Sequence, residues 1–579
     1  MKNLKFSIAL IAAFFATNAL LAQTSVGVDY YLLGEKSKAK SFFEKEIASN
    51  PEEAYFYLGE IAFSEKNFQQ AEAFYSKGQS AYNQIGRAKL KLASDTKAAE
   101  ELLNGIVRKN KGDINVQLAV GRAYLDANMI KQAEKAVAAA KKMDSKNPAV
   151  HILEGDVAFS SQVGGVSEKA GAAGGKYEMS NYFDDNYALG YAKFAQIYQS
   201  VNPSLAARKL ETAIEKRPDY IIAYGMLGRV YARTGFYQKS IDMFEKYFEA
   251  GIYSTEDLEM YARSNYFSDN FEKAAEIVND GLQNNPDHFV LNRYKMYINA
   301  KRKLANEGLE DARKFFSLRA DTGYISLDYS MYAMILDNAK RYDEAFAQYE
   351  KAISMEPESA DVFTDAVAAA RRKKDYALAA VYLKRQMDKK AQLSGESNFS
   401  HDAADISALG YDYYSAGATI VKNEELLKEL MGNRQVADML AANPTVNKAL
   451  LASDVEYFGK TYSLYHLQKA DSIFDILIER LPDSYTGYRF KALVKHAINS
   501  DTEAGLAKPY YEKVAELIGE KDDLSASNKR VLLEAYNYLG YYYYVKNDKP
   551  NTILYWSKVL DIDPGNENAK LVLDAMKNE

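Results

Sequence analysis

The side chains that could carry out chemistry are few, and their spacing does not suit it. The chain has 579 residues and no cysteine, which excludes disulfide frameworks, cysteine-ligated zinc, thiol catalysis and a lipoprotein anchor. No two of its five histidines have the spacing of a helical metal pair; they are His151, His288, His401, His466 and His496. The sequence also lacks a nucleophile elbow, an H-E-x-x-H motif and a serine–histidine–aspartate motif. We therefore expect no catalytic residues, no bound metal and no cofactor.

Two local patterns resemble functional motifs but have structural explanations. Gly174-Gly175-Lys176 could belong to a phosphate-binding loop, but Ala170 replaces the first glycine and Tyr177 replaces the metal-binding hydroxyl. The acidic pairs Glu52-Glu53 and Asp184-Asp185 fall at predicted helix boundaries, where carboxylates cap a helix or meet its positive end. Neither pattern predicts a site.

The composition indicates a folded protein whose main partner is not a polyanion. Hydrophobic residues make up 47% of the chain and charged residues 26%, and the formal net charge is -6. A basic surface is the usual electrostatic signature of proteins that bind nucleic acid or anionic membranes. We therefore expect no nucleic-acid partner.

The N-terminus has the pattern of a secretory signal peptide. Lys2 and Lys5 precede an apolar run from Phe6 to Leu21, and the expected cleavage site follows Ala22. A run of this length with polar breaks is short for a bilayer core about 30 Å thick, so a retained membrane helix is the weaker interpretation. We predict residues 1–22 to be a signal peptide and the mature chain to have no transmembrane segment.

Small residues and prolines recur at a fixed distance along the chain. Six prolines follow a small residue by twelve positions: Ala39/Pro51, Ala206/Pro218, Ala274/Pro286, Ala345/Pro357, Ala470/Pro482 and Thr552/Pro564. Another small residue stands twelve positions earlier in several copies, as Gly228 does before Ser240 and Gly540 before Thr552. Glycine within a helix costs about 1 kcal/mol relative to alanine, so its return at one register requires a close crossing of two helices.

These residues resemble the tetratricopeptide repeat, a helix-turn-helix unit of about 34 residues. The segment from Tyr224 to Tyr231, with Ser240 and Phe244, fits its pattern, and so do the residues from Tyr536 to Pro564. The resemblance implies an all-α, right-handed α-solenoid of about twelve to fourteen stacked repeats. We expect contacts between neighbouring repeats alone to hold it together, with its many tyrosines packed mainly as core residues.

The repeat register predicts how the chain is organised. N-terminal repeats occupy 23–160, and central repeats occupy 161–390 with a glycine-rich insertion near 161–175. The region 391–485 contains one repeat with a helical insertion at about 416–460, because Ala470 follows Gly410 by sixty positions where twelve are expected. C-terminal repeats and a capping helix occupy 486–579. The weak copies include one near 290–320.

The resemblance also implies a partner-binding groove along the first helices of the repeats. Carrying the family's groove positions onto this chain gives Arg122, Arg229, Arg233, Arg263, Tyr266, Arg371, Arg372, Tyr541 and Tyr544. Because arginine binds carboxylates through two hydrogen bonds, an acidic or C-terminal peptide is the expected ligand. Solvated arginines on helix faces are the simpler alternative.

We interpret the chain as an exported scaffold that holds protein or peptide partners in the periplasm or cell envelope of a Gram-negative bacterium. One alternative is a carbohydrate- or peptidoglycan-binding envelope protein that stacks exposed tyrosines on sugar rings. Another is an enzyme with its site in the 416–460 insertion, which has several carboxylates but no histidine. The sequence does not indicate an oligomeric state.

Overall fold

The structure, a computed structural model, describes residues 26–319, 322–356, 359–395, 402–519 and 524–578. These residues form helices and connecting turns, with no strand among them. The predicted signal peptide lies outside the described residues. None of the helices in the described ranges is long and apolar enough to cross a membrane. The chain divides into two compact units, unit 1 ending at Arg302 and unit 2 beginning at Lys303, within a stretch where the sequence repeat is weak.

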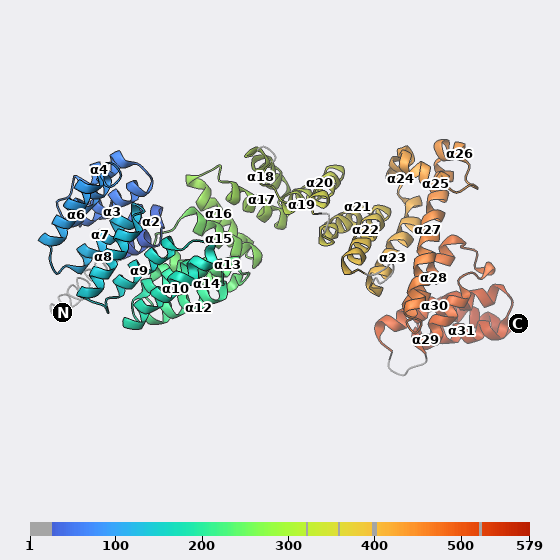
Figure 1. Cartoon of the computed structure of the whole chain (residues 1–579). Coiled ribbons are helices and arrows are strands. Elements are labelled where there is room, and N and C mark those ends of the chain that lie inside the picture. Colours follow the sequence, from blue (N-terminus) through green and yellow to red (C-terminus); the bar gives the residue numbers. More distant parts are fainter. Residues whose placement is uncertain (1–25, 320–321, 357–358, 396–401, 520–523, 579) are drawn as a thin grey trace, which may run out of the picture. The chain divides into compact units, whose positions relative to one another are not determined.

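Unit 1 is a succession of helical hairpins (Figure 1). After the helix at 26–32 and α2 (Lys36–Glu46), the first helices of the hairpins are α3 (Pro51–Ser64), α5 (Ala81–Lys91), α7 (Ile114–Asp126), α9 (Pro148–Ser161), α11 (Ala188–Tyr198), α13 (Ile221–Arg233) and α15 (Thr255–Phe267). Their second helices are α4 (Phe68–Tyr75), α6 (Thr96–Lys109), α8 (Ile130–Met143), α10 (Val166–Phe183), α12 (Pro203–Lys216), α14 (Tyr237–Phe248) and α16 (Phe271–Asn284). The unit ends with α17 (Phe289–Lys301).

Unit 2 continues the pattern with helices of more variable length. It contains α18 (Ala305–Ser317), α19 (Ser326–Asn338), α20 (Tyr342–Met355), η1 (Asp361–Phe363), α21 (Thr364–Lys373), α22 (Tyr376–Ser394), α23 (Ala403–Thr419) and α27 (Val455–Arg480). The last helices are α28 (Tyr485–Ile498), η3 (Thr502–Ala504), α29 (Lys508–Ile518), α30 (Ala526–Val545), α31 (Lys549–Ile562) and α32 (Glu567–Asn578). Helix α32 covers the end of the last hairpin through buried Ala569. The predicted all-α solenoid of stacked helix pairs is thus confirmed.

The recurring small residues occur where an aromatic ring packs against a helix backbone. A Cβ added at Gly228 would lie 3.1 Å from the Phe244 ring, and one at Gly540 would lie 2.9 Å from the Trp556 ring. The Ser240 hydroxyl is fully buried and donates a hydrogen bond of 2.8 Å to the carbonyl of Gly228. Close helix crossing therefore explains the register, as the sequence predicted.

The glycine-rich segment near 161–175 forms a short turn followed by a long helix. Helix α9 ends at Ser161 and α10 begins at Val166, so only 162–165 connect them. Ala173 and Tyr177 on α10 are buried, and the Tyr177 ring packs against Gly155 of α9. The glycines within α10 thus belong to a helix and not to a phosphate-binding loop.

Residues between α23 and α27 form a small helical subdomain. It contains η2 (Ile420–Lys422), α24 (Glu424–Gly432), α25 (Arg434–Ala441) and α26 (Lys448–Ser453) around its own apolar core. Helix α27 is long because its first half covers this core and its second half pairs with α23, where the Phe474 ring packs against Gly410.

The expectation that neighbouring repeats alone hold the chain together is wrong for unit 1. Tyr30 and Leu33 share one hydrophobic core with residues of α11 and α13, and the hydroxyls of Tyr30 and Tyr247 lie 3.3 Å apart. The N-terminal helices therefore pack against hairpins about two hundred residues further along the chain. A terminal segment with enough apolar surface can bury it against any exposed core face, whatever the sequence separation.

Candidate functional site

The first helices of the N-terminal hairpins line a pocket in unit 1. The pocket has a volume of 540 Å³ and is lined by side chains of α3, α5, α7 and α9 together with the helix at 26–32. We call it the channel pocket. Its aromatic lining consists of Tyr31, Phe56, Tyr57, Tyr82 and Tyr187, and its charged lining of Glu52, Glu53, Glu60 and Arg122. A concave site with apolar walls and a few polar groups is the usual form of a binding site.

The helix at 26–32 forms one wall of the channel pocket and is held by polar contacts. The Tyr31 hydroxyl donates a hydrogen bond of 3.0 Å to Glu60 on α3. The Gln196 side chain of α11 donates to the carbonyl oxygen of Leu33. Burial raises the pKa of Asp29 to about 7, although Lys193 lies near enough to oppose the shift. The wall is thus a fixed part of the unit.

Behind the pocket, alternating charges connect the first helices of successive hairpins. The Lys89 ammonium on α5 lies 2.7 Å from Glu60 on α3 and 3.1 Å from Asp126 on α7. Asp156 on α9 accepts from Arg122 at 2.6 Å and from Lys193 at 3.0 Å. Burial alone would raise the pKa of Asp156, but these two cations hold it below its usual value. Each of these buried charges is therefore paired with an opposite one.

Arg229 belongs to a buried ion-pair network and does not face an open groove. Its guanidinium lies 2.7 Å from Glu35 and 2.5 Å from Asp257, and Lys38 lies 2.8 Å from the same aspartate. Arg229 is only 8% exposed. The predicted inward position is thus occupied by the N-terminal segment of the chain itself, and the guanidinium is already satisfied.

The other arginines selected in unit 1 also have internal partners. Arg122 lines the channel pocket but is paired with Asp156. Arg233 is half-exposed and lies 2.8 Å from Glu256. Arg263 lies over the Phe267 ring, and Tyr266 is buried among other aromatic rings. These residues lie on first helices of their hairpins, but the repeat pattern could not show which side chains of the chain itself would contact them.

The residues selected in unit 2 are of two kinds. Arg371 donates hydrogen bonds of 2.9, 3.3 and 2.7 Å to the carboxylate of buried Asp412, and Arg372 pairs with buried Asp337. Tyr541 and Tyr544 are exposed on α30. Contact of these residues with a partner, and tyrosine stacking on sugars, both stay predictions.

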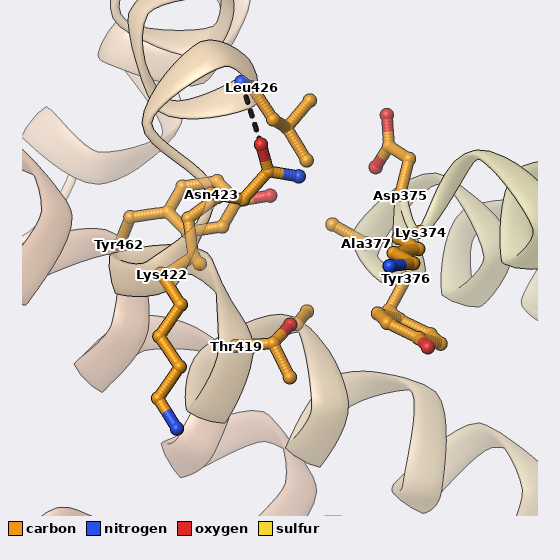
Figure 2. A pocket seen from close by; sticks show the side chains of 11 residues that line it. Lys374, Asp375, Tyr376, Ala377, Thr419, Lys422, Asn423, Leu426 and Tyr462 are labelled. Carbon is orange, nitrogen blue, oxygen red and sulfur yellow. Dashed lines mark hydrogen bonds between the residues drawn. The ribbon is translucent and has the colours of Figure 1, made fainter.

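A second pocket, of 490 Å³, lies beside the inserted helices of unit 2 (Figure 2). Its polar side chains are largely used for helix capping. Asn423 accepts a hydrogen bond from the Leu426 amide, as the dashed line in Figure 2 shows, and Asp375 accepts from the Leu378 amide. The buried ring of Tyr462 forms part of the wall. Since these groups stabilise local structure, the channel pocket is the stronger candidate.

No group of side chains among the described residues has a composition that could hold a metal ion. Of the residues that line the channel pocket, the repeat pattern predicted Arg122 but not the aromatic residues or Glu53. The signal for these residues was weak, because aromatic side chains in a repeat are first expected in the core.

Comparison with known proteins supports the repeat assignment. Tetratricopeptide repeat family models match residues 27–84, 90–156 and 329–359. A comparison with curated proteins finds no match.

Solved structures that resemble the chain include other repeat proteins. The C-terminal part of a repeat protein from Cytophaga hutchinsonii is 23% identical, with 54% of this chain and 99% of that chain covered and a TM-score of 0.38. A tetratricopeptide repeat protein from Parabacteroides merdae is 17% identical over 42% of this chain and 93% of that one, with a TM-score of 0.29. YrrB, described as having an unusual peptide-binding site, is 20% identical over 31% of this chain and 92% of that one, with a TM-score of 0.28.

The family matches fall on helix hairpins, and within the match over 27–84 the Tyr75 ring packs against Gly59 at the expected register. This repeat fold is typical of non-catalytic scaffolds for protein–protein interaction. The chain thus contains tetratricopeptide repeats.

Proposed function

We propose that this protein is an exported scaffold that holds a peptide or helical segment of a partner protein in the channel pocket of unit 1. The observation that carries the proposal is the pocket itself, whose 540 Å³ lie along the first helices of four hairpins. Rigid helices order these side chains before a partner arrives, which lowers the entropic cost of binding. The helix at 26–32, packed along the same helices, is an internal example of the kind of segment these walls accept.

Export of the protein to the periplasm or cell envelope belongs to the same proposal. Its support is the sequence pattern of Lys2, Lys5 and the apolar run from Phe6 to Leu21. Fractionation of cells followed by N-terminal sequencing tests it. We expect an envelope-located chain that begins after Ala22, and a cytoplasmic chain that begins at Met1 would refute export.

The test of binding fills the pocket without disturbing the core. Ala119 on α7 lines the channel pocket and is partly exposed, so Ala119→Arg places a long charged side chain in it. Ala138 is exposed on α8, and Ala138→Arg is the matched control. Crosslinking in cells followed by mass spectrometry measures the captured protein. We expect Ala119→Arg to capture at least tenfold less partner protein than the unaltered chain, with an unchanged circular dichroism spectrum.

The outcome separates the scaffold from its alternatives. Equal capture by both variants would remove the channel pocket from the proposal. Retention on peptidoglycan without any protein crosslink would favour the carbohydrate-binding alternative, in which exposed Tyr541 and Tyr544 of unit 2 are the residues to test.

A further inference from the structure

We propose that the channel pocket recognises a basic side chain, a lysine or arginine of the bound segment. This inference rests on the proposed function and specifies the chemistry of the ligand. It reverses the expectation of an acidic ligand that the groove arginines suggested, because those arginines have partners within the chain. The carboxylates of the pocket, in contrast, do not all have a partner that neutralises their charge.

The aromatic lining contains a cluster of adjacent rings suited to a cation. The ring centroids of Tyr31 and Tyr57 are 5.3 Å apart, those of Tyr57 and Phe56 are 4.9 Å apart, and those of Phe56 and Tyr82 are 5.5 Å apart. All four residues line the pocket. Ring faces attract ammonium and guanidinium groups within about 6 Å, and more strongly where water is displaced. The surface therefore offers stacking positions for a long basic side chain.

Three of the four charged lining residues are already satisfied. Glu60 is paired with Lys89, and Arg122 is paired with Asp156. Glu52 accepts hydrogen bonds of 2.8 Å from the backbone amides of Gln79 and Ser80, which lower its pKa. These groups have little remaining capacity for a ligand charge.

Glu53 is the exception. Its carboxylate accepts a hydrogen bond of 2.6 Å from the Asn50 side chain, and among the described residues no cation pairs with it. Burial raises its pKa, and the nearby carboxylate of Glu46 raises it further. A cation that entered the pocket would oppose both effects, because a nearby positive charge favours the ionised carboxylate. Glu53 and the rings thus define one complementary ligand, a basic group on a flexible apolar stem.

The probe is a phage-displayed library of random twelve-residue peptides, selected on the purified protein. Clones that also bind the Ala119→Arg variant are discarded, so that the remaining clones depend on the channel pocket. We expect lysine and arginine to outnumber aspartate and glutamate by at least threefold in these clones. A synthetic consensus peptide should then bind Glu53→Gln at least fivefold more weakly than it binds the unaltered protein.

Glu134→Gln is the matched control, because Glu134 is exposed on α8 away from the pocket lining. In a charge-reversal arm, Glu53→Lys should bind the same peptide with its basic residue changed to glutamate. Pocket-dependent clones that are acidic or uncharged, or an unchanged affinity in Glu53→Gln, would overturn this inference and leave the proposed function intact. A library without any pocket-dependent clone would count against both.

Discussion

Unit 1 and unit 2 are built from the same repeat but are stabilised differently. In unit 1 the N-terminal helices share a core with α11 and α13, and Glu35 and Lys38 join an ion-pair network with Arg229 and Asp257. In unit 2 the helices pack mainly against their neighbours, and the extra chain between α23 and α27 builds a subdomain of its own. A repeat array can therefore gain long-range contacts from a terminal segment without any change in its repeats.

The largest expected difference between the two units is in the stability lost when a paired arginine is replaced. Arg229→Leu leaves Asp257 buried with one cation fewer, and we expect a loss of about 3–5 kcal/mol from the unfolding free energy of unit 1. In unit 2, Arg489 and Glu534 form a pair whose side chains are each 27% exposed. Arg489→Leu should lower the unfolding free energy by about 1 kcal/mol, because water screens a partly exposed pair.

Hydrogen exchange in increasing urea, read separately for peptides of each unit, measures these two effects. Equal losses in the two units would contradict the buried network in unit 1.

Glycine-to-alanine substitutions at the helix crossings should have the next largest effect on the unfolding free energy. This effect should be the same in both units, because the crossings belong to the repeat itself. A Cβ at Gly59 would lie 2.3 Å from the Tyr75 ring, and one at Gly410 would lie 2.6 Å from the Phe474 ring. We expect Gly59→Ala and Gly410→Ala each to lower the unfolding free energy by about 1–3 kcal/mol, because the rings must move.

Gly105 on α6 is the control for these substitutions, since a Cβ there meets open space. Gly105→Ala should stabilise α6 by about 0.5–1 kcal/mol, as alanine does in helices. Destabilisation of the same size at Gly105 would show that helix propensity, and not ring packing, explains the register.

A smaller effect is expected in unit 2 at low pH. His466 on α27 is buried with neither ring nitrogen hydrogen-bonded within the described structure, and burial lowers its pKa to about 3. Below pH 6.5 the unfolded chain takes up a proton that the folded chain does not, so stability falls as the pH falls from 6.5 towards 3. His466→Phe should remove this dependence and raise the unfolding free energy by about 1–2 kcal/mol at neutral pH. A variant that keeps the wild-type pH slope in urea titrations would exclude His466 as its cause.

A second pH dependence of stability, of opposite sign, is expected in unit 1. Because the folded pKa of Asp29, about 7, exceeds its usual value of 3.8, the folded chain holds a proton that the unfolded chain loses between these values. Stability from this group is complete below pH 3.8 and is lost as the pH rises through 7. Asp29→Asn should remove this pH dependence, because asparagine does not titrate in this range. Urea titration at a series of pH values measures the stability of unit 1. A steeper loss of stability with rising pH in the variant than in the unaltered protein would contradict this assignment.

The sequence was sufficient for the features that repeat and insufficient for those that do not. The register of Gly228 with Phe244 and of Gly540 with Trp556 predicted the helix crossings, because local packing imposes it on each hairpin. The docking of the helix at 26–32 had no comparable signal, since its partners lie far away in sequence. For the same reason Arg229 was expected in an open groove, when Glu35 and Asp257 already hold it.

The channel pocket was predicted in part. Arg122 was selected by its position in the repeat, but Glu53 and Tyr82 resembled an ordinary helix-boundary carboxylate and an ordinary core ring. Only the three-dimensional arrangement shows that Glu53 pairs with no cation of the described residues, while Glu52 and Glu60 have partners.

The pocket wall and the long-range core both require the N-terminal helix to be docked in unit 1, and crosslinking tests this position directly because the chain has no native cysteine. The Gln196 side chain donates to the carbonyl oxygen of Leu33, so cysteines at 33 and 196 should be within reach of a short bifunctional thiol reagent. We predict an efficient intramolecular crosslink in the native Leu33→Cys/Gln196→Cys protein that disappears in urea. A native yield no higher than the yield in urea would contradict the docked helix and the pocket wall that it forms.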